Sequence, residues 1–225
     1  MNKQLYIYDC LNGKLRASDS NFMTLGSGDR CSFRVVTKES NVGSFAQREG
    51  TCRFFPNNKV SQFSLNGIKL STDALIQPNA QYLMVIAGAC LICWYGDPAE
   101  RPDFSQLNPK VWYIHDAEHD EWRGPFKLKD VPVESQDLPE HTYVTFHGLN
   151  NAAFYLCDII DVAHFYMSQV LNNAPNQDLA TKKRIFVCPN CWKKLDKKEA
   201  LAISTHPDLY GDELLGEDGG GGGGG

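Results

Sequence analysis

The sequence has no hydrophobic run long enough to cross a membrane. Its most apolar stretch, residues 82–95, contains Gly88 and falls short of the ~20 residues that a transmembrane helix needs. No apolar signal region follows Met1. We therefore expect a cytoplasmic protein with no membrane contact.

The sequence also has no surplus of positive charge. Lys and Arg number 22 against 27 for Asp and Glu, which gives a net charge of -5. This balance disfavours a surface made for polyanions, although a local basic patch stays open. A phosphate-cradling loop is missing too, because residues 26–28 lack a third glycine, a lysine and a following helix.

Groupings of residues typical of enzyme active sites are weak. Asp161 and His164 can share a helix face, and Cys157 and His147 could supply a thiol and a base, but no nucleophile signature surrounds Cys157. The histidines within residues 115–119 fall at the tip of a predicted hairpin, where a solvated acidic turn is the usual structure. We therefore predict that the protein is not an enzyme.

Short apolar runs separated by Gly, Asn and Pro fill residues 1–96, and this pattern is typical of a β-sandwich. Cys90 and Cys93 lie in one such run, where residues three apart face opposite sides of a strand, so we interpret both as core residues. The expected strands cover residues 5–8, 22–25, 31–36, 44–48, 51–55, 60–64, 68–70 and 82–94.

A second, small α/β unit is predicted over residues 111–175. Residues 97–110 combine charge, glycine and proline and indicate a linker before it. The unit opens with a hairpin over residues 111–126 and continues with a strand over residues 141–146. A helix over residues 158–171 has apolar residues on more than one face, so we expect it to be largely buried.

A zinc-knuckle and helical tail is predicted over residues 182–218. Cys188 and Cys191 are separated by two residues, a spacing that can wrap one tetrahedral zinc ion, and His206 is a candidate third ligand. Two alternatives stay open, a pair of reduced thiols without metal and a thioredoxin-like redox motif. The glycine run 219–225 is excluded from the fold.

Basic residues cluster around the cysteine pair. A cationic face of this kind could contact phosphate backbones, so a nucleic-acid or polyanion-binding module is the alternative function. Acidic residues follow closely enough to neutralise the face, and nucleic acid is therefore the less favoured partner. The basic residues are Lys182, Lys183, Arg184, Lys193, Lys194, Lys197 and Lys198.

Residues 22–95 resemble a forkhead-associated (FHA) domain, a β-sandwich that reads phosphothreonine. The matching segments are Leu25-Gly26, residues 42–46, Leu65-Asn66-Gly67 and residues 75–86. The family's phosphate-binding Arg and Ser and its structural His correspond to Ser27, Val42 and Phe45. Without charge-assisted donors the pocket loses its preference for a phosphate, so no phosphothreonine peptide is expected to bind.

Two further segments carry a resemblance. Trp112-Tyr113, followed by residues 124–126, resembles the start of a GYF-type domain, a small adaptor fold that binds proline-rich peptides through exposed aromatic rings. This resemblance implies peptide contacts at Trp112, Tyr113 and Trp122, with core packing as the alternative for at least two of them.

The segment 188–192, taken with residues 206–212, resembles the start of the zinc ribbon in uncharacterised bacterial proteins that accompany double-GTPase modules. It implies protein partners in a GTPase-containing system. Together these features predict a mainly β chain with a smaller α/β part. The expected function is that of a non-catalytic protein-protein interaction adaptor in a larger bacterial assembly.

Overall fold

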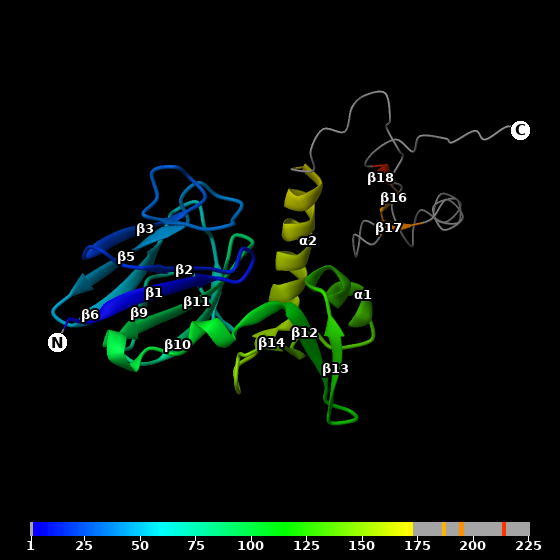
Figure 1. The fold of residues 1–225 in the computed structure, drawn as a ribbon. Coiled ribbons are helices and arrows are strands. Elements are labelled where there is room, and N and C mark those ends of the chain that lie inside the picture. Colours follow the sequence, from blue (N-terminus) through cyan, green and yellow to red (C-terminus); the bar gives the residue numbers. More distant parts are fainter. Residues whose placement is uncertain (1, 173–185, 188–193, 196–212, 215–225) are drawn as a thin grey trace, which may run out of the picture.

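The computed structural model describes residues 2–172, 186–187, 194–195 and 213–214. Strands β1 to β11 form two sheets that face each other (Figure 1), with the orders β2-β1-β11-β10-β7-β8 and β4-β3-β5-β6-β9. The strands are β1 (Gln4–Asp9), β2 (Lys14–Ala17), β3 (Phe22–Gly26), β4 (Phe33–Arg34), β5 (Gly43–Arg48), β6 (Thr51–Pro56), β7 (Phe63–Leu65), β8 (Ile68–Leu70), β9 (Ala74–Ile76), β10 (Gln81–Ile86) and β11 (Ala89–Gly96).

The two sheets enclose one hydrophobic core, because alternate residues of each strand point inward. In β6, Cys52 and Phe54 are buried while Thr51 and Arg53 are exposed. The ring of Phe54 on β6 lies 5.3 Å from that of Phe63 on β7, in the opposite sheet. The predicted mainly β chain with its sandwich is confirmed.

The outer face of the central strands β1 and β11 is buried as well. Tyr6 and Trp94 belong to a second hydrophobic cluster that includes Trp112 and Ile159 from the following unit. Cys93 lies in the sandwich core and Cys90 in this second cluster, which confirms that they face opposite sides of β11. The sandwich and the second unit therefore share apolar packing.

Residues 97–110 join the two units. They contain η1 (Pro98–Glu100), η2 (Phe104–Gln106) and the start of β12 (Asn108–Asp116). Phe104 is buried, with its ring 6.4 Å from that of Tyr6 and 6.1 Å from that of Tyr8. This connection is packed against the sandwich.

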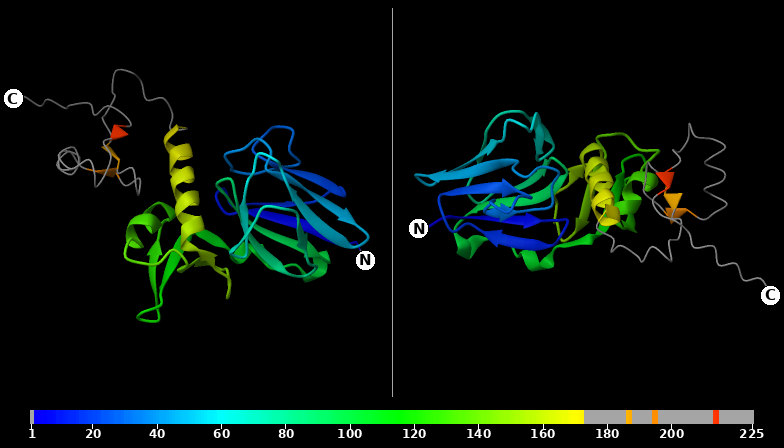
Figure 2. Two further views of the ribbon diagram at one scale, coloured as in Figure 1. Left: turned by 180° about the vertical axis from the view of Figure 1, so that it is seen from behind. Right: turned by 90° about the horizontal axis from the view of Figure 1, so that it is seen from above.

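The second unit is a four-stranded sheet of order β13-β12-β14-β15 with a long helix. Figures 1 and 2 show α2 standing beside the sandwich with this sheet at its foot. The predicted helix is confirmed and extends slightly beyond residues 158–171. The remaining elements are β13 (Glu121–Phe126), η3 (Leu128–Asp130), α1 (Val131–Glu134), β14 (Tyr143–His147), β15 (Phe154–Tyr155) and α2 (Leu156–Asn172).

Two tight turns of the sandwich contact this unit, Asn66-Gly67 and, between β10 and β11, Ala87-Gly88, which lies against Phe165 of α2. In Asn66-Gly67, between β7 and β8, both residues have positive φ, as type I′ hairpin turns require. A Cβ on Gly67 would lie 2.4 Å from a ring carbon of Tyr155. Beside it, the ammonium of Lys69 pairs with the buried carboxylate of Asp158 at the start of α2. Burial lowers the pKa of Lys69, but the Asp158 hydrogen bond and charge outweigh it, and the net shift is upward.

Later in the chain, β16 (Phe186–Val187), β17 (Lys194–Leu195) and β18 (Glu213–Leu214) form a small sheet of order β17-β16-β18. The predicted zinc ligands Cys188, Cys191 and His206 lie outside the described residues. So does most of the basic stretch 182–198, of which only the backbone of residues 186–187 and 194–195 is described. Among the helices in the described part of the chain, none has the length and hydrophobicity to span a bilayer.

Candidate functional site: an aromatic row beside an acidic hairpin

The solvent-facing side of the β13-β12-β14-β15 sheet carries a row of aromatic rings. In β12, Trp112, Ile114 and Asp116 are buried, so the residues between them, Tyr113 and His115, point outward. The strand registers extend this outward face to both sides, because His115 is paired with Trp122 on β13 and Tyr143 with Tyr155 on β15.

Ring-to-ring distances show that the row is continuous. The ring of His115 lies 5.0 Å from that of Trp122 and 6.4 Å from that of Tyr143. Tyr143 in turn stacks on Tyr155 at 5.7 Å and an interplanar angle of 15°. We call these four side chains, Trp122, His115, Tyr143 and Tyr155, the aromatic row. It crosses all four strands of the sheet.

A groove of about 630 Å³ adjoins two members of this row. Trp122 and Tyr143 line it, and each is 50% exposed, which is high for rings of this size. The other wall is the loop of residues 148–153, held to β14 by a 2.8 Å hydrogen bond from Thr145 Oγ1 to the carbonyl of Ala152. Every residue that lines the groove is uncharged.

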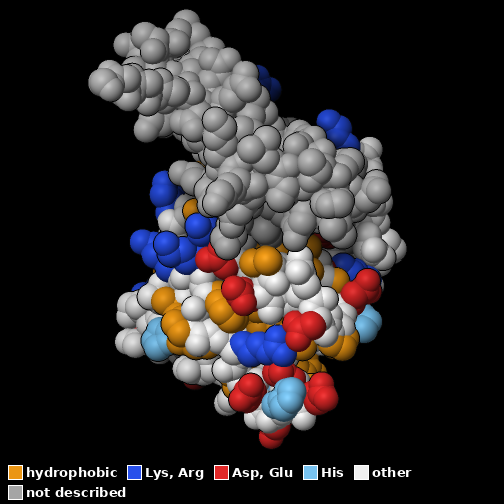
Figure 3. Space-filling model, turned by 90° about the vertical axis from the view of Figure 1, so that its right-hand side faces the viewer, with side chains coloured by type: hydrophobic (Ala, Val, Ile, Leu, Met, Phe, Trp, Pro, Cys, Tyr) orange, Lys and Arg blue, Asp and Glu red, His pale blue; other side chains and the backbone are white. Residues whose placement is uncertain are grey.

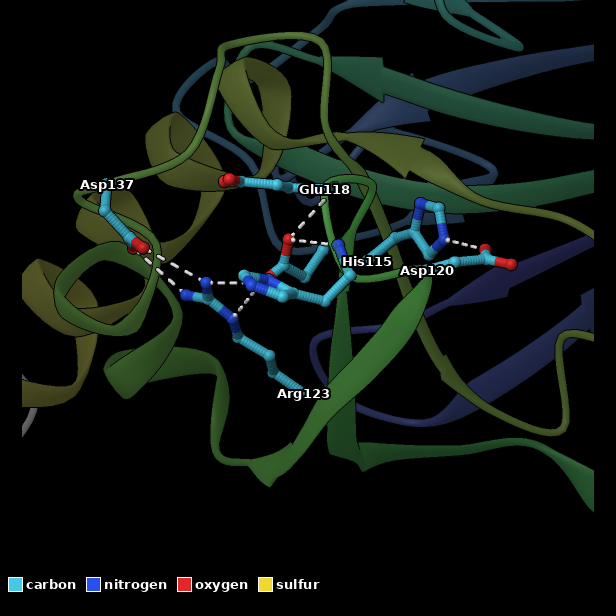
Figure 4. Close-up of polar contacts among 7 residues, drawn as sticks. His115, Glu118, Asp120, Arg123 and Asp137 are labelled. Carbon is cyan, nitrogen blue, oxygen red and sulfur yellow. Dashed lines mark hydrogen bonds and ion pairs between the residues drawn. The ribbon is translucent and has the colours of Figure 1, made fainter.

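The tip of the β12–β13 hairpin is organised by the buried carboxylate of Asp116, which is 2% exposed. Its Oδ2 accepts hydrogen bonds from His119 Nδ1 at 2.9 Å and from Arg123 Nη2 at 2.6 Å, and its Oδ1 accepts from the backbone N–H of Glu118 at 3.2 Å. The Arg123 guanidinium also pairs with Asp137 (Figure 4). These bonds fix the turn and with it the placement of the aromatic row.

Acidic groups surround the tip. Asp120 contacts Nε2 of His115 at 3.3 Å, and Glu118 and Glu121 lie on either side of it along the hairpin. Figure 3 shows red and pale-blue side chains gathered at the lower end of the molecule, where this hairpin ends in Figure 1. The aromatic row therefore borders a region of negative charge.

Asp116, His119 and Glu121 also place three potential metal-ligand atoms within 4.8 Å of one another. Oδ2 of Asp116 is already occupied by donors from His119 and Arg123. The guanidinium of Arg123 sets a positive charge beside any cation bound there. The contacts of Asp116 thus favour a structural role over metal binding.

Acidification is expected to weaken this hairpin. The His119 hydrogen bond, followed by those of Arg123, holds the pKa of Asp116 well below its ordinary value, and Arg123 lowers the pKa of Asp137 as well. A carboxyl whose folded-state pKa is depressed stabilises the fold above its unfolded pKa of about 4, and the stabilisation is lost as the pH falls through the folded value.

The test compares urea unfolding of the natural protein and Asp116→Asn at pH 7 and pH 3. The free energy of unfolding should be higher for the natural protein than for Asp116→Asn at pH 7, and this difference should be smaller at pH 3. The same difference at both pH values would contradict the claim that the ionised carboxylate of Asp116 stabilises the hairpin. Asp19→Asn, which changes an exposed acid far from the hairpin, serves as control.

Two of the sequence-based catalytic candidates, His147 and Cys157, lie near opposite ends of β14 in the described structure. His147 ends β14 opposite Asn108, whereas Cys157 donates its backbone N–H to Glu140, before the start of the same strand. Burial raises the pKa of Cys157, with the Asp158 charge adding to the shift. A nucleophilic thiol needs the opposite shift, so these contacts do not support catalysis at Cys157.

The predicted peptide-binding residues separate into two groups. Trp112 is fully buried and donates its indole N–H to the Pro109 carbonyl at 2.6 Å, so its ring is part of the core. Tyr113 and Trp122 both line the groove. Sequence reasoning missed Tyr143, although the alternation within residues 141–146 was the signal that could have identified it.

The three residues at positions matched to the FHA family's phosphate-binding and structural side chains contact other parts of the sandwich. Ser27 donates its hydroxyl to the backbone carbonyl of Glu39 at 2.9 Å. Val42 and Phe45 are fully buried in the sandwich core. Nearby, the guanidinium of Arg34 pairs with Asp29 at 3.1 Å.

No family model matches this chain, and no curated protein matches it. Among solved structures it is similar to the FHA-1 domain of Rv1747 from Mycobacterium tuberculosis, with 15% identity, 43% of this chain and 100% of that chain covered, and a TM-score of 0.36. It is similar to the FHA domain of CT664 from Chlamydia trachomatis, with 9% identity, 42% and 97% coverage and a TM-score of 0.36. It also resembles the cytoplasmic domain of PscD, a sorting platform protein of the type III secretion system of P. aeruginosa, with 17% identity, 46% and 89% coverage and a TM-score of 0.34.

Proposed function

We propose that the protein is a non-catalytic protein-protein interaction adaptor that holds an extended peptide segment of its partner along the aromatic row. The observation that carries the proposal is the exposure of Trp122 and Tyr143 over an uncharged groove. Rigid aromatic side chains supply a large contact area at low entropic cost, and Trp and Tyr dominate binding energy at interfaces.

Charge narrows the kind of partner. Glu118, Asp120 and Glu121 border the row, so a peptide with basic residues beside its apolar anchors is favoured over an acidic one. A nucleic-acid strand, which also stacks on aromatic rings, would bring its phosphates next to these carboxylates. The polyanion-binding alternative rests on residues 182–198 and stays a prediction.

The sandwich, in this proposal, serves as a framework. Ser27 and Val42 stand at the family's phosphate-binding positions and Phe45 at that of its structural His, so we propose that the sandwich has no preference for phosphothreonine peptides. We also propose that the chain works in a larger bacterial, GTPase-containing assembly, as the zinc-ribbon resemblance implies.

The test of the function is binding of a proline-rich peptide carrying two arginines, followed by NMR of the tryptophan indole N–H groups. The indole N–H of Trp122 should shift on titration, whereas that of Trp112, which is buried and bonded to Pro109, should not. Trp122→Ala should weaken binding about 30-fold, since a central aromatic anchor contributes about 2 kcal/mol.

Phe22→Ala is the matched control, because Phe22 is also an exposed ring, on β3 of the sandwich. It should leave peptide affinity unchanged. Equal affinities for the natural protein and Trp122→Ala, or a shift at Trp112 in place of Trp122, would remove the aromatic row as the contact surface.

For the tail, we propose zinc binding by Cys188 and Cys191, with His206 as a third ligand. Elemental analysis of protein purified without chelator should find up to about one zinc per chain, and Cys188→Ser should lose it. Cys31→Ser, a change in a partly exposed sandwich thiol, should keep the metal. Zinc-free natural protein, or equal zinc in Cys188→Ser, would contradict the proposal.

A further inference from the structure

A second hollow, of about 700 Å³, lies where four parts of the chain meet. They are the end of β1 with its following turn, residues 107–110 at the start of β12, the segment around η3, and the last part of α2. Most of its lining is apolar, and its volume falls in the range of about 300 to 1,000 Å³ that is typical of small-molecule sites. No residue of the aromatic row or of the groove beside it lines this hollow.

The walls of this hollow are fixed by packing. Leu128 at its base is buried, and Tyr8 stacks on Phe104 on the sandwich side. At the mouth, Val170 of α2 is 46% exposed. The hollow is thus formed by ordered elements and keeps apolar surface in contact with solvent.

Three lysines, Lys110, Lys127 and Lys129, line the same hollow. Among the described residues none of the three has an ion-pair partner, and no Asp or Glu lines the hollow with them. The chain as a whole has a net charge of -5, so this local concentration of positive charge is opposite in sign to the average. Unpaired cations beside an apolar wall complement a ligand with an anionic head and an apolar body.

We propose that this hollow binds a small amphipathic anion, with a carboxylate or phosphate head among Lys110, Lys127 and Lys129. Its aliphatic body lies against Leu128 and Val170. The volume of the hollow suits a single small molecule.

The experiment uses four probes that share one dodecyl chain and differ in the head: dodecanoate, dodecyl phosphate, dodecanol and dodecyltrimethylammonium. Each is titrated into the full-length protein by calorimetry, below its micelle concentration. The two anions should bind at least about tenfold more tightly than the alcohol, and the cation more weakly still. Equal affinity for all four heads would overturn the proposal, because the lysines would then contribute nothing.

The triple variant Lys110→Gln/Lys127→Gln/Lys129→Gln removes two exposed charges and one partly buried charge. It should lower anion affinity at least about tenfold and leave the affinity for the alcohol unchanged. Lys3→Gln/Arg48→Gln/Lys59→Gln removes the same charge from distant exposed positions and should leave anion affinity unchanged. Val170→Glu should weaken the anions by placing a carboxylate at the mouth. Anion binding that falls equally in both triple variants would contradict a localised site.

Vesicles of anionic phospholipid separate a monomer site from a membrane-binding surface. We expect the two monomeric anions to bind and vesicle sedimentation to show no association. Sedimentation with vesicles in the absence of monomer binding would overturn the proposal in favour of a lipid surface.

Discussion

Trp112→Ala should lower the free energy of unfolding by about 3–5 kcal/mol, the usual cost of removing a large buried ring. Trp112 is fully buried and lies 5.1 Å from Phe146 and 6.2 Å from Phe154, measured between ring centroids. Its indole N–H bond to the Pro109 carbonyl is lost as well. Urea unfolding followed by far-ultraviolet circular dichroism measures the change.

The matched control is Trp122→Ala, which truncates the same side chain on the solvent face of the same sheet. Because Trp122 is half exposed, we expect its effect on stability to stay within about 1 kcal/mol. The two variants therefore separate packing from binding, since Trp112 matters for stability and Trp122 for the peptide. Similar losses of stability in both would show that the inward and outward faces of β12 and β13 are assigned incorrectly.

Gly88→Ala should lower the free energy of unfolding by about 2–5 kcal/mol. Gly88 has φ +79°, where an alanine costs about 1–2 kcal/mol, and its added Cβ would lie 2.6 Å from Cδ1 and 3.2 Å from Cβ of Phe165 on α2. The Cβ of Phe165 is attached to the helix backbone, so the contact is relieved only by displacing α2. Overpacking of this kind typically costs about 1–3 kcal/mol more.

Gly13→Ala isolates the steric part of this effect. Gly13 has a similar φ of +68°, but its added Cβ would meet only the Tyr8 hydroxyl, at 3.8 Å. Gly13→Ala should lower the free energy of unfolding only by the cost of placing an alanine at positive φ, about 1–2 kcal/mol. If thermal or urea unfolding gives the same loss for both glycines, α2 does not rest on the Ala87-Gly88 turn as the structure has it.

Much of the strand content was predictable because buried strands keep a period of two. Runs such as residues 22–25 and 51–55 gave strands within one or two residues of their observed bounds. Strand β2 was not predicted, since all four of its residues are exposed and no alternation marks it. The short β9 lacks the length needed to reveal a pattern.

The candidate site was predictable only in part. Trp122 and Tyr113 were identified, but proximity in sequence grouped them with Trp112, which points the other way. Tyr155 lies far along the chain and joins the aromatic row only through strand pairing with Tyr143. In the second hollow, Lys127 and Lys129 share the segment around η3, whereas Lys110 belongs to β12. Nothing in the spacing of Lys110 from the other two indicates that the three converge.

The shared packing between the sandwich and its neighbour has a practical consequence for anyone who wishes to express the first 96 residues alone. Such a fragment would expose the outer face of the six-stranded sheet, including Tyr6, Leu83, Ile92 and Trp94. An open apolar surface of that kind promotes self-association. We therefore expect the isolated fragment to self-associate more strongly than the longer chain does.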